Sequence, residues 1–435
     1  MKIKKHLSLA PLVEGFKSAF SNYKDDRREN STNYTVLDTA LSGLACMFYK
    51  SENMVNYQER MEKKHHKNNL QTQFGVKETP KDNQMRSIIG SIPSAQFAPI
   101  FSNYLTRLQR SKHLATFQFQ KKYLVAIDGT EYYSSDKISC PCCLTQVKRD
   151  GNTQYTHKVL QPIICHPDQK HILPLMPEEI KNTDGTDKQD CEINAANRLL
   201  PSIRATHPRM SFIWLADSLY ATAPFIGGII SAGEEFLFRV KQGDHKKLYS
   251  FIKTAPYESY RTTSDNGKTT IAHRWYKDVP LNGSTDITVT VIQAFSITTD
   301  KDGNVSSTTI GVWATNLDVT EITVAEITRA ARSRWKIENE FFNALKNQGY
   351  DLTHNWGHVN GESFNFYLLT MLGFYIHQIL DMTDTLFQWC RRIGRTFKHF
   401  WRDMEFLFRM FLFDSWEEML CFYIEKNEET PPMLI

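Results

Sequence analysis

Two short apolar runs, each ending in an aspartate, place the strongest constraint on the fold. Tyr123–Ile127 is a continuous run with β-branched residues that leads into Asp128-Gly-Thr130, which predicts a buried strand followed by a turn. Met210–Ala216 repeats the pattern and ends at Asp217. Helical and strand patterns alternate around these runs, which indicates an α/β sheet. Two carboxylates at the ends of two such strands can face each other across neighbouring positions of one sheet.

A third acid lies on a predicted helix between cations. Residues 331–348 contain neither Pro nor Gly, and Gly349 follows where a C-terminal cap belongs. Arg334 and Glu338 are four residues apart, so they share one helix face as ion-pair neighbours. Lys346 lies about 80° off that face, within reach of a long side chain or of a small helix irregularity. The alternative is an ordinary amphipathic helix with solvated charges.

The 435 residues are enough for a large core and for two or three domains. We expect a mixed α/β sheet with helices, interrupted by a β-rich insertion and flanked by all-α regions at both ends. The expected units are a helical domain at 1–119, whose excess of Lys and Arg suits DNA binding, the first part of the α/β core at 120–241, the β-rich insertion at 242–320, a core helix carrying Glu338 within 321–355, and a helical C-terminal region at 356–435.

The net charge of +4 is unevenly spread. Residues 1–120 contain 18 Lys and Arg against 10 Asp and Glu, a net charge of +8, so the remainder carries −4. Lys63, Lys64 and Lys67 form a basic cluster within this segment. A basic segment beside an acidic remainder suits a polyanion-binding module attached to a unit that needs carboxylates. The alternative is a helical cap that packs on the next domain.

Cys140-Pro-Cys-Cys143 has the two-residue spacing of half a zinc site. No second Cys-x-x-Cys follows it, so other residue types would have to complete the set. The later candidates are His157, Cys165, His166 and His171. A loop with free thiols is the competing interpretation.

Composition points to a reducing compartment and away from a membrane. Eight cysteines in a chain of this length, with no recognisable secretion signal, favour the cytoplasm. The most apolar run, Phe364–Leu380, contains Asn365, His377 and Gln378 and is too short for a membrane span. We therefore expect a cytoplasmic protein with no membrane partner.

Asp128, Asp217 and Glu338 together match the needs of two-metal phosphoryl transfer. Carboxylates prefer hard cations such as Mg²⁺ or Mn²⁺, and three of them on rigid elements can converge on two ions. Arg334 and Lys346 beside the glutamate would hold phosphate groups without chemistry of their own.

Three motifs resemble a known family. They are Ala126-Ile-Asp-Gly-Thr130, Leu215-Ala-Asp-Ser-Leu-Tyr220, and Arg334-Trp-Lys-Ile-Glu338 with Lys346 and Gly349-Tyr350. In this order they are similar to the DDE transposases of bacterial insertion sequences, which have an RNase H-like catalytic core, and most of all to the insertion sequence four group. The resemblance spans roughly residues 120–355.

The resemblance implies a metal-binding catalytic triad of Asp128, Asp217 and Glu338. It implies cut-and-paste chemistry on double-stranded DNA, at terminal inverted repeats and in target DNA, with a DNA hairpin as an intermediate. The enzyme would act as a homodimer on DNA, associated with the bacterial nucleoid. A β-rich insertion between the second aspartate and the glutamate also belongs to that group.

The chain departs from the group's pattern at two places. Ala331 stands where the group has a Tyr, and Lys346 lies eight residues after Glu338 where the group has seven. The extra residue makes Glu340 a rival for the role of Glu338. Two other classes of protein share these features: an RNase H-like nuclease without strand transfer, and a non-catalytic DNA-binding protein derived from a transposase.

Overall fold

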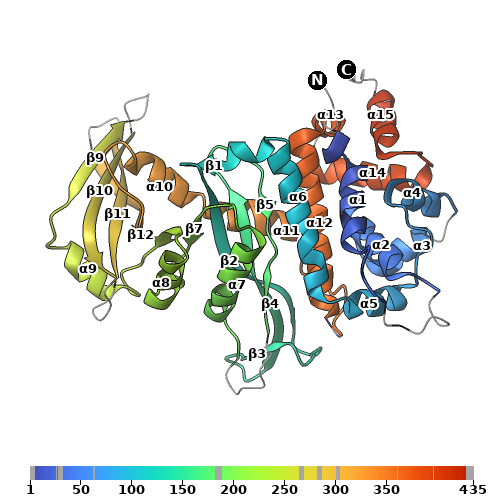
Figure 1. The fold of residues 1–435 in the computed structure, drawn as a ribbon, viewed down its shortest axis with the longest axis horizontal. Helices are drawn as coiled ribbons and strands as arrows, with labels where there is room; N and C mark the ends of the chain where they lie inside the picture. The colour runs from blue at the N-terminus through green and yellow to red at the C-terminus, as the bar shows by residue number, and fades with distance from the viewer. Residues whose placement is uncertain are drawn as a thin grey trace.

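The strands form one sheet that occupies one end and the centre of the molecule, and the N- and C-terminal helices pack at the other end (Figure 1). In a computed structural model of the chain, the structure describes residues 5–25, 27, 33–61, 64–181, 189–263, 269–281, 287–299, 304–359, 361–394 and 396–427, without the side chains of 5, 59, 60 and 64–68.

The first part of the chain, up to Phe117, is helical. Its helices are η1 (Lys5–Leu7), α1 (Leu9–Ala19), α2 (Val36–Phe48), α3 (Met54–Met61), α4 (Lys64–Phe74), α5 (Asp82–Ser91), η3 (Ser94–Phe97), α6 (Ala98–Arg110) and η4 (His113–Phe117). Thr35 caps α2 by accepting a hydrogen bond from the backbone N–H of Asp38, as its residue type favours.

Strands and helices then alternate. They are β1 (Gln118–Phe119), β2 (Lys122–Ser135), β3 (Leu144–Val147), β4 (Thr153–Cys165), β5 (Leu173–Pro174), β6 (Glu178–Ile180), α7 (Glu192–Thr206), β7 (Phe212–Ala216), α8 (Ala223–Ser231), β8 (Glu235–Arg239), α9 (Lys246–Ile252), β9 (Glu258–Thr263), β10 (Thr269–Pro280), β11 (Thr288–Thr299) and β12 (Val305–Thr315).

Helices return in the last part. They are α10 (Val324–Arg332), the π-helical segment η5 (Ile337–Phe342), α11 (Asn343–Asn347), α12 (Glu362–Thr383), α13 (Thr385–Ile393), α14 (Phe397–Met410) and α15 (Trp416–Lys426). No helix in the described ranges is long and apolar enough to cross a membrane.

The strands form one sheet of twelve, in the order β3-β4-β2-β7-β8-β12-β11-β10-β9, with β1 on β2 and both β5 and β6 on β4. Among the described strands, only the β2–β7 and β7–β8 pairs are parallel. The mixed α/β sheet flanked by helical regions confirms the expected fold class.

The β-rich segment continues the central sheet. Strand β12 pairs with β8 through Trp313↔Arg239 and its neighbours, and β11, β10 and β9 extend the sheet from there (Figure 1). Trp275 and Tyr276 of β10 are buried, as aromatic residues of strands usually are.

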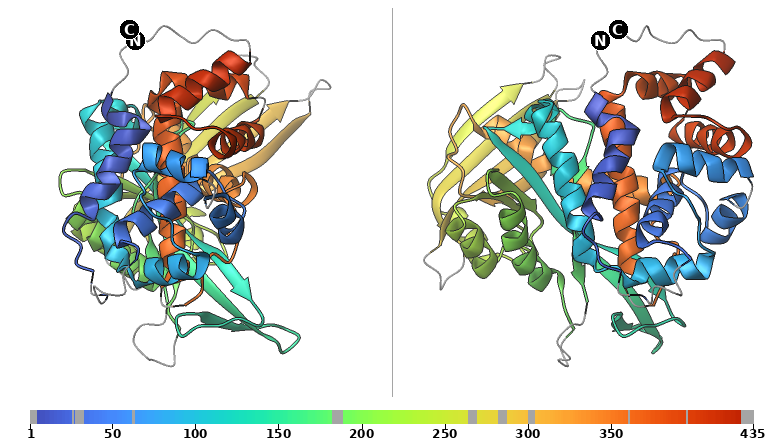
Figure 2. Two further views of the ribbon diagram at one scale, coloured as in Figure 1. Left: turned by 90° about the vertical axis from the view of Figure 1, so that its right-hand side faces the viewer. Right: turned by 45° about the vertical axis from the view of Figure 1, so that its right-hand side comes forward.

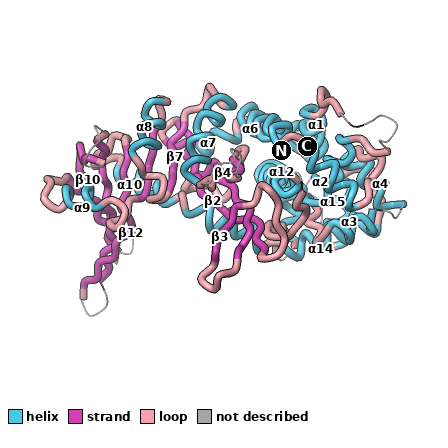
Figure 3. Tube along the Cα trace, turned by 90° about the horizontal axis from the view of Figure 1, so that it is seen from below, coloured by secondary structure: helices cyan, strands magenta, loops and turns pink. Residues whose placement is uncertain are grey.

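Helix α12 joins the two helical ends of the chain into one core. It runs between α1, α2, α5 and α6, as the turned views show (Figure 2). A Cβ at Gly373 would lie 3.4 Å from backbone atoms of Met47 and Phe48, so glycine lets α12 approach α2 closely. Asn365 donates hydrogen bonds to the carbonyls of Ile89 and Ile92. Seen from below, the N- and C-terminal helices gather on one side, whereas α7, α8, α9 and α10 lie beside the strands on the other (Figure 3).

Two local predictions are wrong. Asp128-Gly-Thr130 is not a turn, because β2 continues to Ser135 through antiparallel pairing with β4, including Asp128↔Gln161. Asp184-Gly-Thr-Asp187 predicts the start of a helix that runs to about Arg204, but the described helix α7 begins at Glu192, and Asp184 lies outside the described residues.

Candidate active site

The two aspartates lie at the same edge of the parallel part of the sheet. Strands β2 and β7 pair in parallel up to Ala126↔Leu215, and each acid lies two residues beyond that pair. Neighbouring parallel strands advance at the same rate, so Asp128 and Asp217 reach the same level. The Asp217 carboxylate accepts a hydrogen bond from the backbone N–H of Leu219 at 2.9 Å, which turns the chain away from the sheet.

The third acid is brought beside Asp128 by an arginine. Arg334 Nη1 lies 2.7 Å from Glu338 Oε1 and 3.5 Å from Asp128 Oδ2. The first contact is the one that the four-residue spacing predicts. Arg334 is only 7% exposed, so this cation is held inside the protein between two carboxylates.

The segment that carries Glu338 is not the continuous α-helix that the sequence predicts. Helix α10 ends at Arg332, a turn follows at Ser333 and Arg334, and the chain resumes helically into the π-helical segment Ile337–Phe342. Trp335, expected on the apolar side, is 45% exposed. The break lets Arg334 point at β2 instead of continuing the surface of α10.

Burial and the neighbouring carboxylates together raise the pKa of Asp128. Burial is the largest cause that raises the pKa of Asp128 to about 7. Arg334 opposes the rise, whereas Glu338, Glu192 and Asp217 add to it. Arg334 alone does not neutralise the carboxylates around Asp128, so a bound metal cation would supply the missing positive charge.

Glu192 is a site residue that the sequence did not reveal. It lies in the first turn of α7, accepts a hydrogen bond from Tyr220 at 2.8 Å, and raises the pKa of both Asp128 and Tyr220. A Cβ on Gly129 would fall 2.3 Å from the Glu192 carboxylate, so glycine is needed there for close approach. An acid in a first helical turn is a common partner of the helix dipole, so nothing in the sequence singled it out.

Glu340, the rival acid, faces elsewhere. Both of its carboxylate oxygens lie 2.9 Å from Lys336 Nζ. Glu340 and Lys336 line an open groove on another face of this segment. The geometry favours Glu338 as the acid that joins the aspartates.

The π-helical segment changes where Lys346 falls. A π-type turn contains one residue more than an α-helical turn. The eight residues from Glu338 to Lys346 include such a turn, so they rotate about the helix axis by about as much as seven α-helical residues. Seven α-helical residues place Lys346 within about 20° of the face of Glu338, whereas eight would place it about 80° away. Lys346 is exposed, on the helix α11 that follows. Lys63 and the side chains of Lys64 and Lys67 lie outside the described residues.

A basic groove of about 700 Å³ runs along the adjacent face of the same segment. Its charged and aromatic lining comes from α10, η5 and the strands β8 and β12. These residues are Arg239, Trp313, Arg329, Arg332, Trp335, Lys336 and Glu340. Four cations against one acid, with an exposed Trp335, suit a nucleic acid strand.

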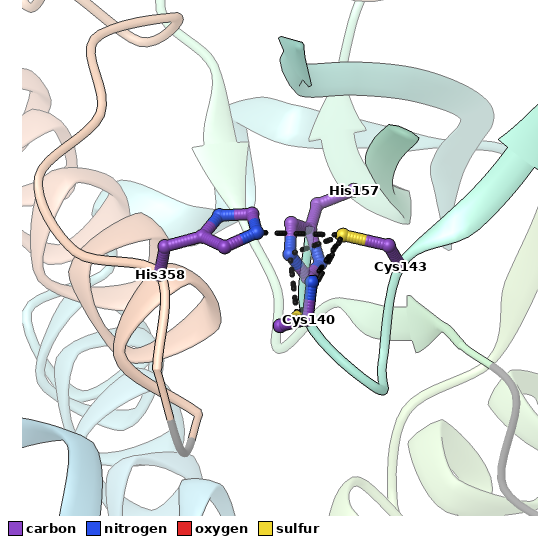
Figure 4. A group of neighbouring side chains, drawn as sticks. All are labelled: Cys140, Cys143, His157 and His358. Atoms are coloured by element: carbon purple, nitrogen blue, oxygen red, sulfur yellow. Dashed lines mark hydrogen bonds between the residues drawn. The ribbon is translucent and has the colours of Figure 1, made fainter. Parts of the chain in front are cut away.

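A second cluster lies past the C-terminal end of β2, next to the Tyr133↔His157 pair of β2 and β4 (Figure 4). Cys140, Cys143, His157 and His358 bring four potential ligand atoms within 4.8 Å of one another. Burial lowers the pKa of His157 to about 4 and also lowers the pKa of His358, so both rings are neutral at pH 7.

Only part of this cluster was predicted. The sequence offered Cys140, Cys143 and His157 but not His358, which is 215 residues from Cys143. The other three candidates lie elsewhere: Cys165 donates to the Ser333 carbonyl, His166 lies near Asp168, and His171 contacts Asp381.

No family model matches the chain, and no curated protein matches it. Among solved structures, the chain is similar to the piggyBac transposase in a synaptic complex with hairpin DNA, with a TM-score of 0.39 and 10% sequence identity. The alignment covers 98% of this chain and 81% of that chain. This similarity is too low to assign a family or an activity, so function is inferred from the residues of the site.

Proposed function

We propose that the chain is a DNA transposase of the DDE type, which cuts and joins phosphodiesters at the ends of a bacterial insertion sequence. The observation that carries the proposal is the meeting of Asp128 and Glu338 on the two sides of Arg334, with Asp217 at the same level on the neighbouring strand. Residues from three separated segments converge, as a catalytic site requires and a solvated helix face does not.

The donor set fits hard divalent cations. Asp128, Asp217 and Glu338 offer only oxygen ligands, and the raised pKa of Asp128 reflects buried negative charge that the protein itself does not neutralise. When bound, Mg²⁺ or Mn²⁺ would polarise the phosphate and activate the attacking oxygen. Glu192 contributes a fourth carboxylate that holds Tyr220 and adds to the local negative charge.

The chain's own cations have the complementary task of holding DNA. Arg334 keeps Asp128 and Glu338 in fixed positions, and its remaining donors can reach a phosphate. Lys346 follows on nearly the same helix face, and the basic groove offers Arg239 and Arg332 to a strand that leaves the site. We propose the N-terminal helices, including the Lys63, Lys64 and Lys67 cluster, as a further DNA contact.

The test is a cleavage and joining assay with purified protein, Mg²⁺ or Mn²⁺, and DNA that carries both flanks of the element. Asp128→Asn, Asp217→Asn and Glu338→Gln should each abolish cleavage while leaving DNA binding and the unfolding midpoint close to wild type. Glu340→Gln is the matched control and should keep most of the activity, because Glu340 pairs with Lys336 on another face.

Three outcomes would redirect the proposal. Cleavage that persists in Asp128→Asn would reject the site. Cleavage without joining, when ends cut in advance are supplied, would identify a nuclease of the same architecture. Absence of both reactions in the wild-type chain, with Mn²⁺ binding retained, would favour a non-catalytic DNA-binding descendant.

A further inference from the structure

The Cys/His cluster past the C-terminal end of β2 has the dimensions of a metal coordination shell. The two sulfur atoms of Cys140 and Cys143 are 3.7 Å apart. His157 Nε2 lies 3.4 Å from Cys140 Sγ and 3.5 Å from Cys143 Sγ, and His358 Nε2 lies 3.4 Å from Cys143 Sγ. Both histidines therefore present the same ring nitrogen to the same point (Figure 4).

These separations match the edges of a tetrahedron around zinc. With Zn–S of about 2.3 Å and Zn–N of about 2.0–2.1 Å, a tetrahedral site has S–S edges of about 3.8 Å and S–N edges of about 3.5 Å. The four edges that involve these S–S and S–N contacts differ from the ideal values by at most a few tenths of an ångström, and the other two separations are within 4.8 Å. Two cysteines and two histidines are also a donor set that zinc uses in structural sites.

A disulfide between the two cysteines does not account for the cluster. A disulfide needs its sulfur atoms about 2.05 Å apart, and both cysteines are free. The turn is already shaped for a ligand pair, because Cys143 N–H donates to the Cys140 carbonyl and Cys140 N–H donates to Cys143 Sγ. Backbone N–H donation to sulfur stabilises a thiolate, which is the form that binds metal.

We propose that Cys140, Cys143, His157 and His358 bind one structural zinc ion, which ties the β3–β4 region to the loop that connects the Glu338 segment with α12. Four protein ligands leave no open coordination position, so the ion would have no catalytic role. Tyr133 packs on the His358 ring at 4.4 Å and helps to exclude water.

The loop that supplies His358 is prepared for this role. The backbone N–H groups of His358 and Val359 both donate to Glu362 Oε2, at 2.9 and 3.0 Å, where α12 begins. A metal bound to His358 would fix the segment that connects α11, the helix after Glu338, with α12. The ion would therefore hold the third acid's segment against the sheet without touching the carboxylates.

Metal analysis of the full-length chain tests the proposal. Purified wild type, dialysed exhaustively against metal-free buffer, should retain about one zinc ion per chain. Its zinc X-ray absorption spectrum should fit two sulfur and two nitrogen neighbours. Cys143→Ser and His358→Ala should lose most of the metal. The matched controls, Cys142→Ser from the same turn and His354→Ala from the same loop, should keep it.

The wild-type measurements decide the question even if a ligand variant fails to fold. A wild-type chain that has no zinc after growth with added zinc would overturn the proposal. So would a spectrum with oxygen neighbours, or a Cys140–Cys143 disulfide found by mass spectrometry of the unreduced chain. The measurement needs no DNA, so its failure leaves the proposed transposase activity untouched, and the reverse also holds.

Discussion

The carboxylate cluster around Asp128 and the Cys/His cluster past the end of β2 differ in the chemistry of their donors. Around Asp128, hard oxygen donors gather and repel one another, and one arginine does not offset them. Around Cys143, soft sulfur and neutral nitrogen donors lie in a buried pocket with tetrahedral spacing. The first arrangement suits ions that exchange and carry substrate phosphates; the second suits an ion that stays. The two clusters therefore suit different ions, an exchangeable one at Asp128 and a permanent one at Cys143.

The largest expected difference between the clusters is their response to a chelator. Brief treatment with EDTA should stop DNA cleavage completely, because Mg²⁺ held by a few carboxylates exchanges rapidly. Zinc in a closed Cys₂His₂ site should remain, and added Mg²⁺ alone should restore cleavage. Activity and zinc content measured on the same samples check this. Recovery that required zinc would break the distinction between the two sites.

Removing the arginine between the acids should have the next largest effect. Arg334→Met leaves Asp128 and Glu338 without their shared cation, so cleavage should fall by about 10²-fold or more. The pKa of Asp128 should rise further, because Arg334 is the group that lowers it. Lys277→Met is the control, since Lys277 pairs with Glu258 on β9 and lines neither the acidic site nor the basic groove. Equal losses in the two variants would contradict a special role for Arg334.

Divalent metal affinity should depend on pH through Asp128. The pKa of Asp128 is about 7 in the folded protein, above the usual value of 3.8, so folding favours the protonated carboxyl. This favours the folded state most below about pH 4, and the advantage is lost as the pH rises to about 7. Metal binding displaces the proton, so the Mn²⁺ dissociation constant should rise about tenfold per unit below about pH 7. Titrations from about pH 5.5 to about pH 8 measure it. Asp128→Asn should flatten the curve, and a flat wild-type curve would refute the assignment.

The smallest effect is expected in the shell around the acids. Tyr220→Phe removes the hydrogen bond to Glu192 and should cost about 1 kcal/mol in the free energy of unfolding. Cleavage should fall less than in Arg334→Met, because Glu192 keeps its position in the first turn of α7. Chemical denaturation and the cleavage assay measure the two effects. An activity loss as large as that of Asp128→Asn would move Tyr220 into the reacting site.

Local pattern sufficed where the determining interactions are close in sequence. The apolar runs before Asp128 and Asp217 predicted two buried strands, and the spacing of Arg334 and Glu338 predicted their ion pair. Periodicity and four-residue spacing are properties of strands and helices themselves, so they can be read without the fold. The same reasoning misjudged Asp128-Gly-Thr130, because a Gly after an Asp is a common turn former and pairing with β4 decides otherwise.

The sequence by itself indicated the alternation of elements, the three acids and three of the four residues of the Cys/His set. Only the tertiary structure decided that Glu192 joins the acids, that Glu340 turns away, and that His358 completes the tetrahedron across 215 residues. It also decided that the β-rich segment extends the central sheet. The reason is physical: these results depend on which distant segments pack together, and burial, charge repulsion and ligand geometry arise only after they meet.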